Sequence, residues 1–397
     1  MRWLQWGATV LLVILAAIAR AEAPARPDDP LAAWQSGVRV QPACPTAERH
    51  TIHAYFNTCP ESPDGQWLLF YASRTADSHR GELWILNRET GKEERLVEGL
   101  EIEDAHRTAC QQWISGGRRV AFHNVREGRW SVMVVDMDGR AVRTLAQDRQ
   151  LCWGAAEGDV LPVYGCHWNP GPHRDLELVN AATGAVRTAV TAEAVQAAYP
   201  QWIAKSFGQR PVSIFFPILS PDGKRVFFKM ATAGNGNVRS SKASTRMGLV
   251  AYDLQESRFL FLREQWGHPS WHPQGVCILE KGNLRIDAAD GQVHRIAGLP
   301  NFSGSHPSFS PDGKLFVTDG VLEKTPGLGG QKGEWGVFVC RSDGGGYVQI
   351  HRFDNSQGAR SWRVAHPHPV FSPDGRRIYF NVSATRWTQL FVAEIGG

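Results

Sequence analysis

The sequence predicts an all-β fold, a seven-bladed β-propeller of four-stranded antiparallel blades, and a recurring turn motif is the main reason. The tetrapeptide Ser-Pro-Asp-Gly occurs four times, within "ESPDGQWLLFY", "LSPDGKRVFFK", "FSPDGKLFVTD" and "FSPDGRRIYFN". Three degenerate copies, "WISGGRRVAFH", "GAAEGDVLPVY" and "WHPQGVCILEK", fill the gaps between them. Units at a spacing of roughly 40 to 60 residues that each supply four short strands are typical of propeller blades.

Each unit follows the same strand pattern. An apolar strand enters the turn, the Asp-Gly or Gly-Gly pair supplies the positive φ angles of a tight hairpin, and an alternating strand leaves it. A third strand such as "WSVMVVDMDG" and a fourth such as "EERLVEG" complete the unit. No helical period and no second hydrophobic block interrupts this pattern, so residues 36–397 are expected to form one domain. A pair of β-sandwiches is the competing architecture.

The last unit, which reads "LFVAEIGG" at its end, supplies only three strands. The stretch around Val38 to Tyr55 is the available donor of a fourth strand. Pairing this stretch into the last blade would close the ring and cover an open sheet edge.

The N-terminal residues 1–21 resemble a signal peptide, with a positive start at Arg2, an apolar run from Gly7 to Ile18 and small residues around position 20. We therefore expect an exported protein, periplasmic or extracellular, with an uncleaved anchor as the alternative. No later stretch approaches about 18 apolar residues, so no membrane span is expected after cleavage. The formal net charge of +4 is mild, and we expect a monomer with no nucleic-acid partner.

The seven cysteines permit disulfides in an exported chain, although the odd number leaves at least one thiol free. Spacing alone does not assign the pairs. Cys152 and Cys166, which could lie on adjacent strands, are the first candidates.

Histidines recur at one position relative to the turn. Four residues before the first turn residue lie His268, His306 and His368, in the fifth, sixth and seventh units. The corresponding residues of the first four units are Thr58, Cys110, Leu151 and Phe216. Because equivalent positions of the innermost strands meet at one end of a propeller axis, these histidines are expected to converge there. His366 has the same side-chain parity as His368 and should join them.

A single histidine at this position would most simply be a structural feature of the repeat. Four clustered histidines instead favour a site, in which three imidazoles could hold Mn, Fe, Ni or Zn. His272 replaces a turn serine at the opposite face and is expected to be structural. No such argument applies to His106 or His123.

Two long polar insertions, residues 231–246 and 323–336, are expected at the same end of the axis. They would bring cationic side chains near the histidines, where an anionic ligand could bind. These cations are Arg239, Lys242, Arg246 and Lys332. The alternative is that both insertions are solvated flexible loops.

The stretches "YFNTCPESPDG", "GHPSW", "SHPSFSPDG" and "HPHPVFSPDG" resemble the oligogalacturonate lyases of polysaccharide lyase family twenty-two, from about Tyr55 onward. The turn motif alone is also similar to TolB-like propellers and to the propellers of prolyl oligopeptidase relatives. The placement of the histidines is what distinguishes the lyases among these families.

The resemblance implies a Mn²⁺ ion held by His306, His366 and His368, and a catalytic role for His268 as base. The family has a fourth ligand, a glutamine, where this sequence has Arg363. Since a guanidinium does not bind metals, Arg363 is expected to bind substrate instead.

The arginine that supports the base is expected to be Arg246, or, as a less favoured alternative, Arg239, which is otherwise a substrate-binding candidate. The implied activity is metal-assisted β-elimination of oligogalacturonides, with an acidic oligosaccharide as substrate. The alternative is a non-enzymatic TolB-like propeller that binds a protein or a glycan. A serine peptidase is excluded as a class because the sequence has no hydrolase domain and no Gly-x-Ser-x-Gly stretch.

Overall fold

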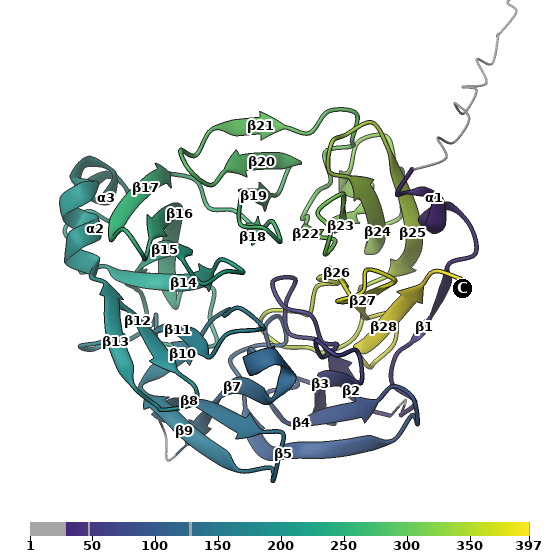
Figure 1. Cartoon of the computed structure of the whole chain (residues 1–397), viewed down its shortest axis with the longest axis horizontal. Helices are drawn as coiled ribbons and strands as arrows, with labels where there is room; N and C mark the ends of the chain where they lie inside the picture. Colours follow the sequence, from purple (N-terminus) through teal and green to yellow (C-terminus); the bar gives the residue numbers. More distant parts are fainter. Residues whose placement is uncertain (1–28, 47, 127–128, 397) are drawn as a thin grey trace, which may run out of the picture.

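The chain forms a closed ring of seven antiparallel sheets, each with four strands, in a computed structural model that describes residues 29–46, 48–126 and 129–396 (Figure 1). The predicted all-β, seven-bladed propeller is therefore confirmed, and the alternative of two sandwiches is not observed. The expected signal peptide, residues 1–21, lies outside the described residues.

In the first six blades the strands follow the chain from the central axis outward (Figure 1). Blade one contains β2 (His50–Ile52), β3 (Trp67–Ser73), β4 (Arg80–Asn87) and β5 (Glu93–Glu101). Blade two contains β6 (Gln112–Ile114), β7 (Arg119–Arg126), β8 (Arg129–Asp136) and β9 (Val142–Gln147). Blade three contains β10 (Arg149–Leu151), β11 (Val160–Gly165), β12 (Leu176–Asn180) and β13 (Val186–Val190). Blade four contains β14 (Ser213–Leu219), β15 (Arg225–Ala233), β16 (Ser244–Asp253) and β17 (Arg258–Arg263). Blade five contains β18 (Ser270–Trp271), β19 (Cys277–Glu280), β20 (Leu284–Asp287) and β21 (Val293–Arg295). Blade six contains β22 (Ser308–Phe309), β23 (Leu315–Val321), β24 (Glu334–Arg341) and β25 (Tyr347–Asp354).

The seventh blade combines both ends of the described chain. It contains β26 (Val370–Phe371), β27 (Arg377–Val382), β28 (Gln389–Glu394) and, as its outer strand, β1 (Arg39–Pro42). β1 pairs antiparallel with β28, with Val40 opposite Ala393. The ring is thus closed by the N-terminal stretch, which covers the edge that three strands would leave open.

A buried ion pair also joins blades one and seven. The Glu61 carboxylate accepts hydrogen bonds from Nε and Nη2 of Arg377, both at 2.9 Å, and from the Tyr379 hydroxyl. Since each charge has a bidentate partner, this contact fixes the geometry at the closure.

The Ser-Pro-Asp-Gly motif explains its own recurrence. In the seventh blade the Ser372 hydroxyl donates to Asp374 at 2.6 Å and accepts from the backbone N–H of Arg377 at 2.9 Å. Gly375 donates its N–H to the Ser372 carbonyl and has a φ of 72°, a conformation that favours glycine. Every residue of the motif except the proline thus has a hydrogen-bonding or conformational task in the hairpin.

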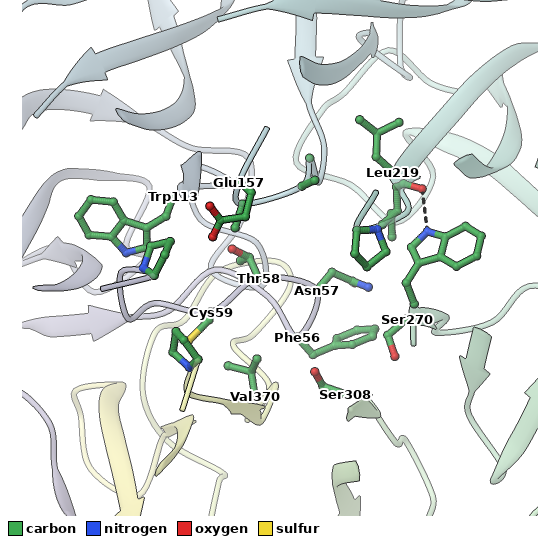
Figure 2. A pocket seen from close by; sticks show the side chains of 18 of the residues that line it. Phe56, Asn57, Thr58, Cys59, Trp113, Glu157, Leu219, Ser270, Ser308 and Val370 are labelled. Atoms are coloured by element: carbon green, nitrogen blue, oxygen red, sulfur yellow. Dashed lines mark hydrogen bonds between the residues drawn. The ribbon is translucent and has the colours of Figure 1, made fainter. Parts of the chain in front are cut away.

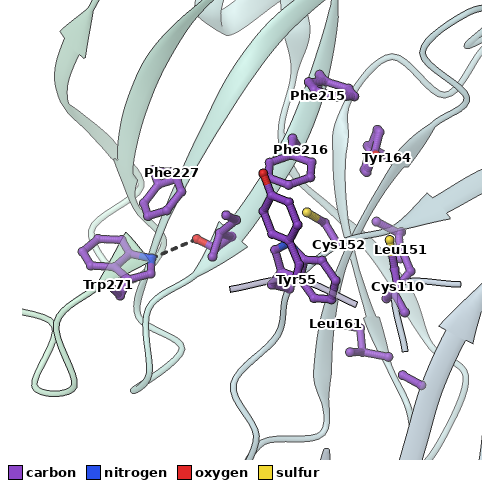
Figure 3. Close-up of a cluster of buried hydrophobic side chains, with 14 of the residues drawn as sticks. Tyr55, Cys110, Leu151, Cys152, Leu161, Tyr164, Phe215, Phe216, Phe227 and Trp271 are labelled. Atoms are coloured by element: carbon purple, nitrogen blue, oxygen red, sulfur yellow. Dashed lines mark hydrogen bonds between the residues drawn. The ribbon is translucent and has the colours of Figure 1, made fainter. Parts of the chain in front are cut away.

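The largest hydrophobic cluster surrounds the axis between blades one and five (Figure 3). Tyr55, from the link between β2 and β3, stacks on Trp153 with a centroid distance of 5.6 Å. Phe216 and Leu151 are buried in the same cluster. This side of the ring is therefore packed with apolar side chains.

Three α-helices occur in the described part of the chain that the sequence pattern did not predict, so the expectation that no helix interrupts the repeat is wrong. They are α1 (Ala32–Gln35), α2 (Ala192–Ala198) and α3 (Pro200–Phe207). α2 begins at Thr191, whose hydroxyl accepts from the N–H of Ala194, and α3 has a proline at its start. Both helices belong to the connection between blades three and four and pack against the strands of these blades. Within the described residues, no helix has the length and apolar character needed to span a membrane.

The proposed disulfide between Cys152 and Cys166 is not formed, and none of the seven cysteines, all of which are described, is paired. The register of β10 and β11 gives the reason. Cys152 lies opposite Pro162, to whose carbonyl it donates its N–H, whereas Cys166 follows Gly165, which pairs with Arg149. The two thiols thus lie at opposite ends of the strand pair.

Candidate metal and catalytic site

Four histidines meet at the end of the axis where the innermost strands begin. His306 and His368 lie two residues before β22 and β26, and His366 and His106 join them from neighbouring segments. Each offers a ring nitrogen, and these nitrogens all lie within 4.8 Å of one another. The structure therefore brings His306, His366 and His368 together, as the repeat position predicts, and adds His106, which the sequence analysis set aside.

His306 is oriented by a buried carboxylate. Its Nδ1 lies 2.9 Å from both carboxylate oxygens of Asp319, and its backbone N–H donates to the same side chain at 2.8 Å. Both side chains are fully buried. Because a carboxylate only accepts, Nδ1 carries the ring proton and Nε2 presents its lone pair to the other histidines.

His368 has a conformation that is uncommon for a residue with a side chain, with a φ of 49°. Its backbone N–H points to Asp319, at 3.3 Å, and its carbonyl accepts from Nε2 of His53 at 2.8 Å. These bonds hold the kinked backbone and aim the imidazole at the axis. His366, two residues earlier, places its Nδ1 3.5 Å from Nε2 of His306.

His106 comes from the link between β5 and β6. Its Nδ1 faces the backbone carbonyl of Val364 at 3.3 Å, which leaves Nε2 to point toward the group. Its ring centroid lies 4.6 Å from that of His366 and 4.5 Å from that of His368.

Burial keeps three of these imidazoles neutral. It lowers the pKa of His106 well below its usual range, and the charge of Arg363 adds to this effect. Burial, followed by the nearby His306 ring, lowers the pKa values of His366 and His368 in the same way. Neutral imidazoles have free lone pairs, which is the protonation state that metal binding requires.

The four histidines fit a divalent metal ion. Within the described part of the chain, Nε2 of His106 and both ring nitrogens of His368 are buried without a hydrogen-bond partner. Buried polar atoms are rarely left without a partner, and a shared metal ion would satisfy these nitrogens. The carboxylate of Asp319 behind His306 is the usual outer partner of a histidine that binds metal.

His268 lies beside this group rather than in it. Its ring stacks on that of His306, with a centroid distance of 4.4 Å and an interplanar angle of 27°. Nδ1 lies 3.0 Å from the carbonyl of Ser305, so Nδ1 carries the proton and Nε2 is the basic nitrogen. The position suits a proton acceptor next to a metal-bound ligand.

Two buried charges hold the backbone that carries His268, and the sequence analysis missed both. Nζ of Lys229 donates to the carbonyl of Gly267 at 2.6 Å and lies 3.3 Å from the ring centre of Trp266. The Glu280 carboxylate accepts from the N–H of His268. A Cβ on Gly267 would lie 1.8 Å from Glu280, so only glycine fits between the two charges.

Arg363 lies close enough to act on the site electrostatically. Its charge helps to lower the pKa values of His106, His366 and His368, after the larger effect of burial. The Arg363 side chain is partly exposed.

Arg246 lies half-buried in a different polar network. Its Nε donates to Ser244 at 2.8 Å, its Nη2 lies 3.2 Å from Nε2 of His167, and its guanidinium lies over the ring of Phe215. His167 in turn contacts Glu103 at 3.2 Å. Burial, more than any neighbouring charge, lowers the pKa of Arg246 to about 10. Contacts with these residues, rather than with His268, define its position.

Arg239 is committed to an ion pair. Its Nη2 lies 2.8 Å from the Glu101 carboxylate and donates to the carbonyl of Ile102 at 3.1 Å. The insertion after β15 therefore reaches from blade four to the link between blades one and two. Lys242 and Lys332, from the two insertions, are exposed.

The residues Tyr55 and Phe56 form an aromatic floor beneath the histidines. The Tyr55 ring lies 4.5 Å from that of His368, and the Phe56 ring lies 5.3 Å from that of His306. On its other side Phe56 lines a cavity of about 320 Å³, which also contacts Trp113 and Trp271 (Figure 2). The turn prolines line this cavity, so it belongs to the opposite end of the axis. Near it His272, expected to be structural, packs against Phe309.

Comparisons with known proteins support the fold. No family model matches the chain, and no curated protein sequence does. Among solved structures, an oligogalacturonate lyase in complex with manganese matches 91% of this chain and 97% of its own, with a TM-score of 0.60 and 18% identity. The oligogalacturonate lyase from Vibrio parahaemolyticus matches 91% of this chain and 98% of its own, with a TM-score of 0.59 and 17% identity.

The chain shares the propeller fold of these lyases. The β-propeller domain of Cps50 (Swd1) from Myceliophteria thermophila also matches, over 88% of this chain and 100% of its own, with a TM-score of 0.52 and 12% identity. The resemblance to oligogalacturonate lyases is thus confirmed at the level of the fold, and the activity has to be argued from the site.

Proposed function

We propose that the protein is a metal-assisted lyase that cleaves acidic oligosaccharides, oligogalacturonides in particular, by β-elimination. The observation that carries the proposal is the convergence of His306, His366 and His368, with His268 stacked beside them. Two solved structures with the same fold are oligogalacturonate lyases, one of them in complex with manganese.

In the proposed reaction His268 takes the proton from carbon 5 of a uronate unit. Its Nδ1 is held by the Ser305 carbonyl, so Nε2 is the accepting atom. The electrons of the broken C–H bond form a double bond between carbons 4 and 5. The bond from carbon 4 to the glycosidic oxygen then breaks, and that oxygen takes a proton from water.

The histidine group would hold the divalent ion. When bound there, an ion such as Mn²⁺ supplies Lewis-acid neutralisation of the uronate carboxylate, which makes the proton on carbon 5 more acidic. Lys229 and Glu280 hold the two polar atoms of the peptide group between Gly267 and His268 and thereby help to fix the direction of the His268 imidazole. Arg363, partly exposed and close to the histidines, is the proposed partner of a substrate carboxylate. Arg246 is proposed as the arginine that supports the base, from a position where it contacts Ser244 and His167, whereas Arg239 would first have to leave Glu101.

The test is incubation of the purified chain with short galacturonides and a divalent ion, with detection of the absorbing unsaturated product. Elimination forms a carbon–carbon double bond, which hydrolysis does not. His268→Ala should lose turnover and keep the metal, because the base contacts the substrate rather than the ion. His272→Ala, a histidine at the turn end of the axis, is the matched control and should retain full activity.

The absence of product from every galacturonide tested, in protein that carries its metal, would refute the lyase. It would favour the alternative of a propeller that binds a glycan or a protein without catalysis. Arg363→Gln further distinguishes the lyase from the binding propeller. A gain in metal affinity is expected if this arginine stands in place of a metal ligand.

We also propose that the mature protein is exported, periplasmic or extracellular, and monomeric. The apolar N-terminal run with small residues near position 20 supports export. N-terminal sequencing of the protein recovered outside the cytoplasm should begin close to residue 22. Recovery of a chain that begins at Met1 would contradict cleavage.

A further inference from the structure

We propose that His106 is the fourth imidazole ligand of the metal site and that this site prefers a nitrogen-binding divalent ion, such as Zn²⁺ or Ni²⁺, over Mn²⁺. The inference depends on the metal-binding part of the proposed function and is independent of the elimination chemistry.

The position of His106 relative to the other rings is the first support. Its ring nitrogen belongs to the group that lies within 4.8 Å, and its centroid is 6.0 Å from that of His306. Its Nε2 is buried and lacks a hydrogen-bond partner among the described residues. A nitrogen in this situation is destabilising unless an ion or another group accepts its lone pair.

The local backbone holds His106 in place. The Asp104 carboxylate accepts from the N–H groups of His106 and Arg107, both at 3.0 Å, and Thr108 donates its N–H to the Asp104 carbonyl at 3.1 Å. The resulting tight turn projects the imidazole from the link between blades one and two toward residues of blades six and seven. A side chain held this firmly is preorganised as a ligand, which reduces the entropy lost on binding.

The donor set determines which ion is preferred. All four candidate ligands are imidazoles, and the carboxylate of Asp319 is engaged with Nδ1 of His306 and acts from behind the ring. Imidazole nitrogen suits zinc, copper, iron and nickel, whereas manganese favours carboxylate, carbonyl and water oxygens. Within the series of divalent ions, nitrogen sites also bind manganese more weakly than the later ions.

The experiment uses the full chain, freed of metal with a chelator, and Co²⁺ as a spectroscopic probe. We expect one Co²⁺ per chain, with a visible absorption spectrum that depends on its ligands, displacement by equimolar Zn²⁺, and no displacement by equimolar Mn²⁺. His106→Ala should weaken binding by more than the roughly 10- to 100-fold that loss of an outer partner causes, and should change the Co²⁺ spectrum.

His123→Ala is the matched control, since His123 is as deeply buried as His106 but lies outside the group. It should bind Co²⁺ with the affinity and spectrum of the unchanged protein. His106→Gln supplies an oxygen donor of similar size; it should shift the preference toward Mn²⁺ and serves if the alanine variant does not fold.

An unchanged Co²⁺ affinity and spectrum in His106→Ala, or in the glutamine variant if alanine prevents folding, would refute the role of His106. Mn²⁺ that displaces Co²⁺ as readily as Zn²⁺ does would refute the selectivity, and a chain that binds no Co²⁺ would refute both. These outcomes differ from failure of the proposed function, in which the metal binds as described and no galacturonide is cleaved.

Discussion

Two arcs of the same ring use one backbone position in different ways. Blades two to four place apolar or weakly polar side chains four residues before the turn, and blades five to seven place imidazoles there. The first set, called the apolar arc, is Cys110, Leu151 and Phe216; the second, called the histidine arc, is His268, His306 and His368. The first three pack into the cluster of Figure 3, and the others line the candidate site.

A kinked backbone at this position occurs in both arcs, although not in every blade. Cys110, Phe216 and His368 have φ values of 50°, 57° and 49°, although positive φ is unusual for residues with a Cβ, whereas Leu151, His268 and His306 do not have a positive φ. Because the kink occurs with three different side chains, it does not depend on a histidine. The two arcs differ in the side chains that they present to the axis, so the apolar arc should govern stability and the histidine arc should govern metal binding.

The largest expected effect on the free energy of unfolding comes from a substitution in the apolar arc. Leu151 is fully buried, and Leu151→Ala should lower the free energy of unfolding by about 2–5 kcal/mol through lost contacts and a cavity. Metal affinity should be unchanged, because no ligand is touched. Urea unfolding of the metal-free protein measures the first quantity, and Co²⁺ titration the second. A large loss of metal affinity in this variant would mean that the two arcs are not separable.

Metal should stabilise the protein only through the histidine arc. At a free Zn²⁺ concentration of about 100 times Kd, a ligand that binds the folded state alone adds about 2.7 kcal/mol. We expect this increase in the unchanged protein and in Leu151→Ala, and none in His368→Leu. Thermal unfolding with Zn²⁺ and with chelator gives the comparison. An equal increase in His368→Leu would place the ion elsewhere.

Without metal, the histidine arc should lower stability. Both ring nitrogens of His368 are buried without hydrogen-bond partners in the described structure. His368→Leu, which gives this position the side chain found in blade three, should therefore raise the free energy of unfolding by about 1 kcal/mol in chelator. The kink is no obstacle, since Phe216 adopts it. Destabilisation instead would show that the imidazole has a packing role.

Sequence periodicity was sufficient to predict the ring of blades and the histidines on one side of the candidate site. The turn motif located every blade, and counting back from it located His268, His306 and His368, because all the inner strands share one geometry. His366 followed from strand parity.

His106 was missed because it lies outside that geometry. It belongs to a turn in which Thr108 and Cys110 both have positive φ, so neither strand parity nor the count from the hairpin applies. The only signal was the polar run "EDAHR", which ends five residues before the inner strand β6. Lys229 and Glu280 were missed for another reason, since each was a single charge within an alternating strand, and only the fold shows that both meet the backbone beside His268. The helices α2 and α3 lie in a connection between blades, where the repeat sets no pattern.

The smallest effect concerns Lys229, which lies where the arcs meet, with Nζ 5.6 Å from the ring centre of Phe216 and bonded to the residue before His268. Burial lowers the pKa of Lys229 to about 7, an effect that the Glu280 charge opposes. The unfolded chain keeps its lysine protonated up to about pH 10.4. Between these values the unfolded state binds more protons, so the contribution of this group to stability rises with pH and is least favourable below pH 7.

Lys229→Met removes the titration of this side chain. Its free energy of unfolding, measured in chelator and compared with that of the unchanged protein, should therefore fall relative to the latter by about 1 kcal/mol between pH 7 and pH 8. Lys229→Arg, which stays charged throughout, should fall relative to the unchanged protein in the same direction. A difference between the methionine variant and the unchanged protein that stays constant across this range would mean that the ammonium remains protonated where the arcs meet.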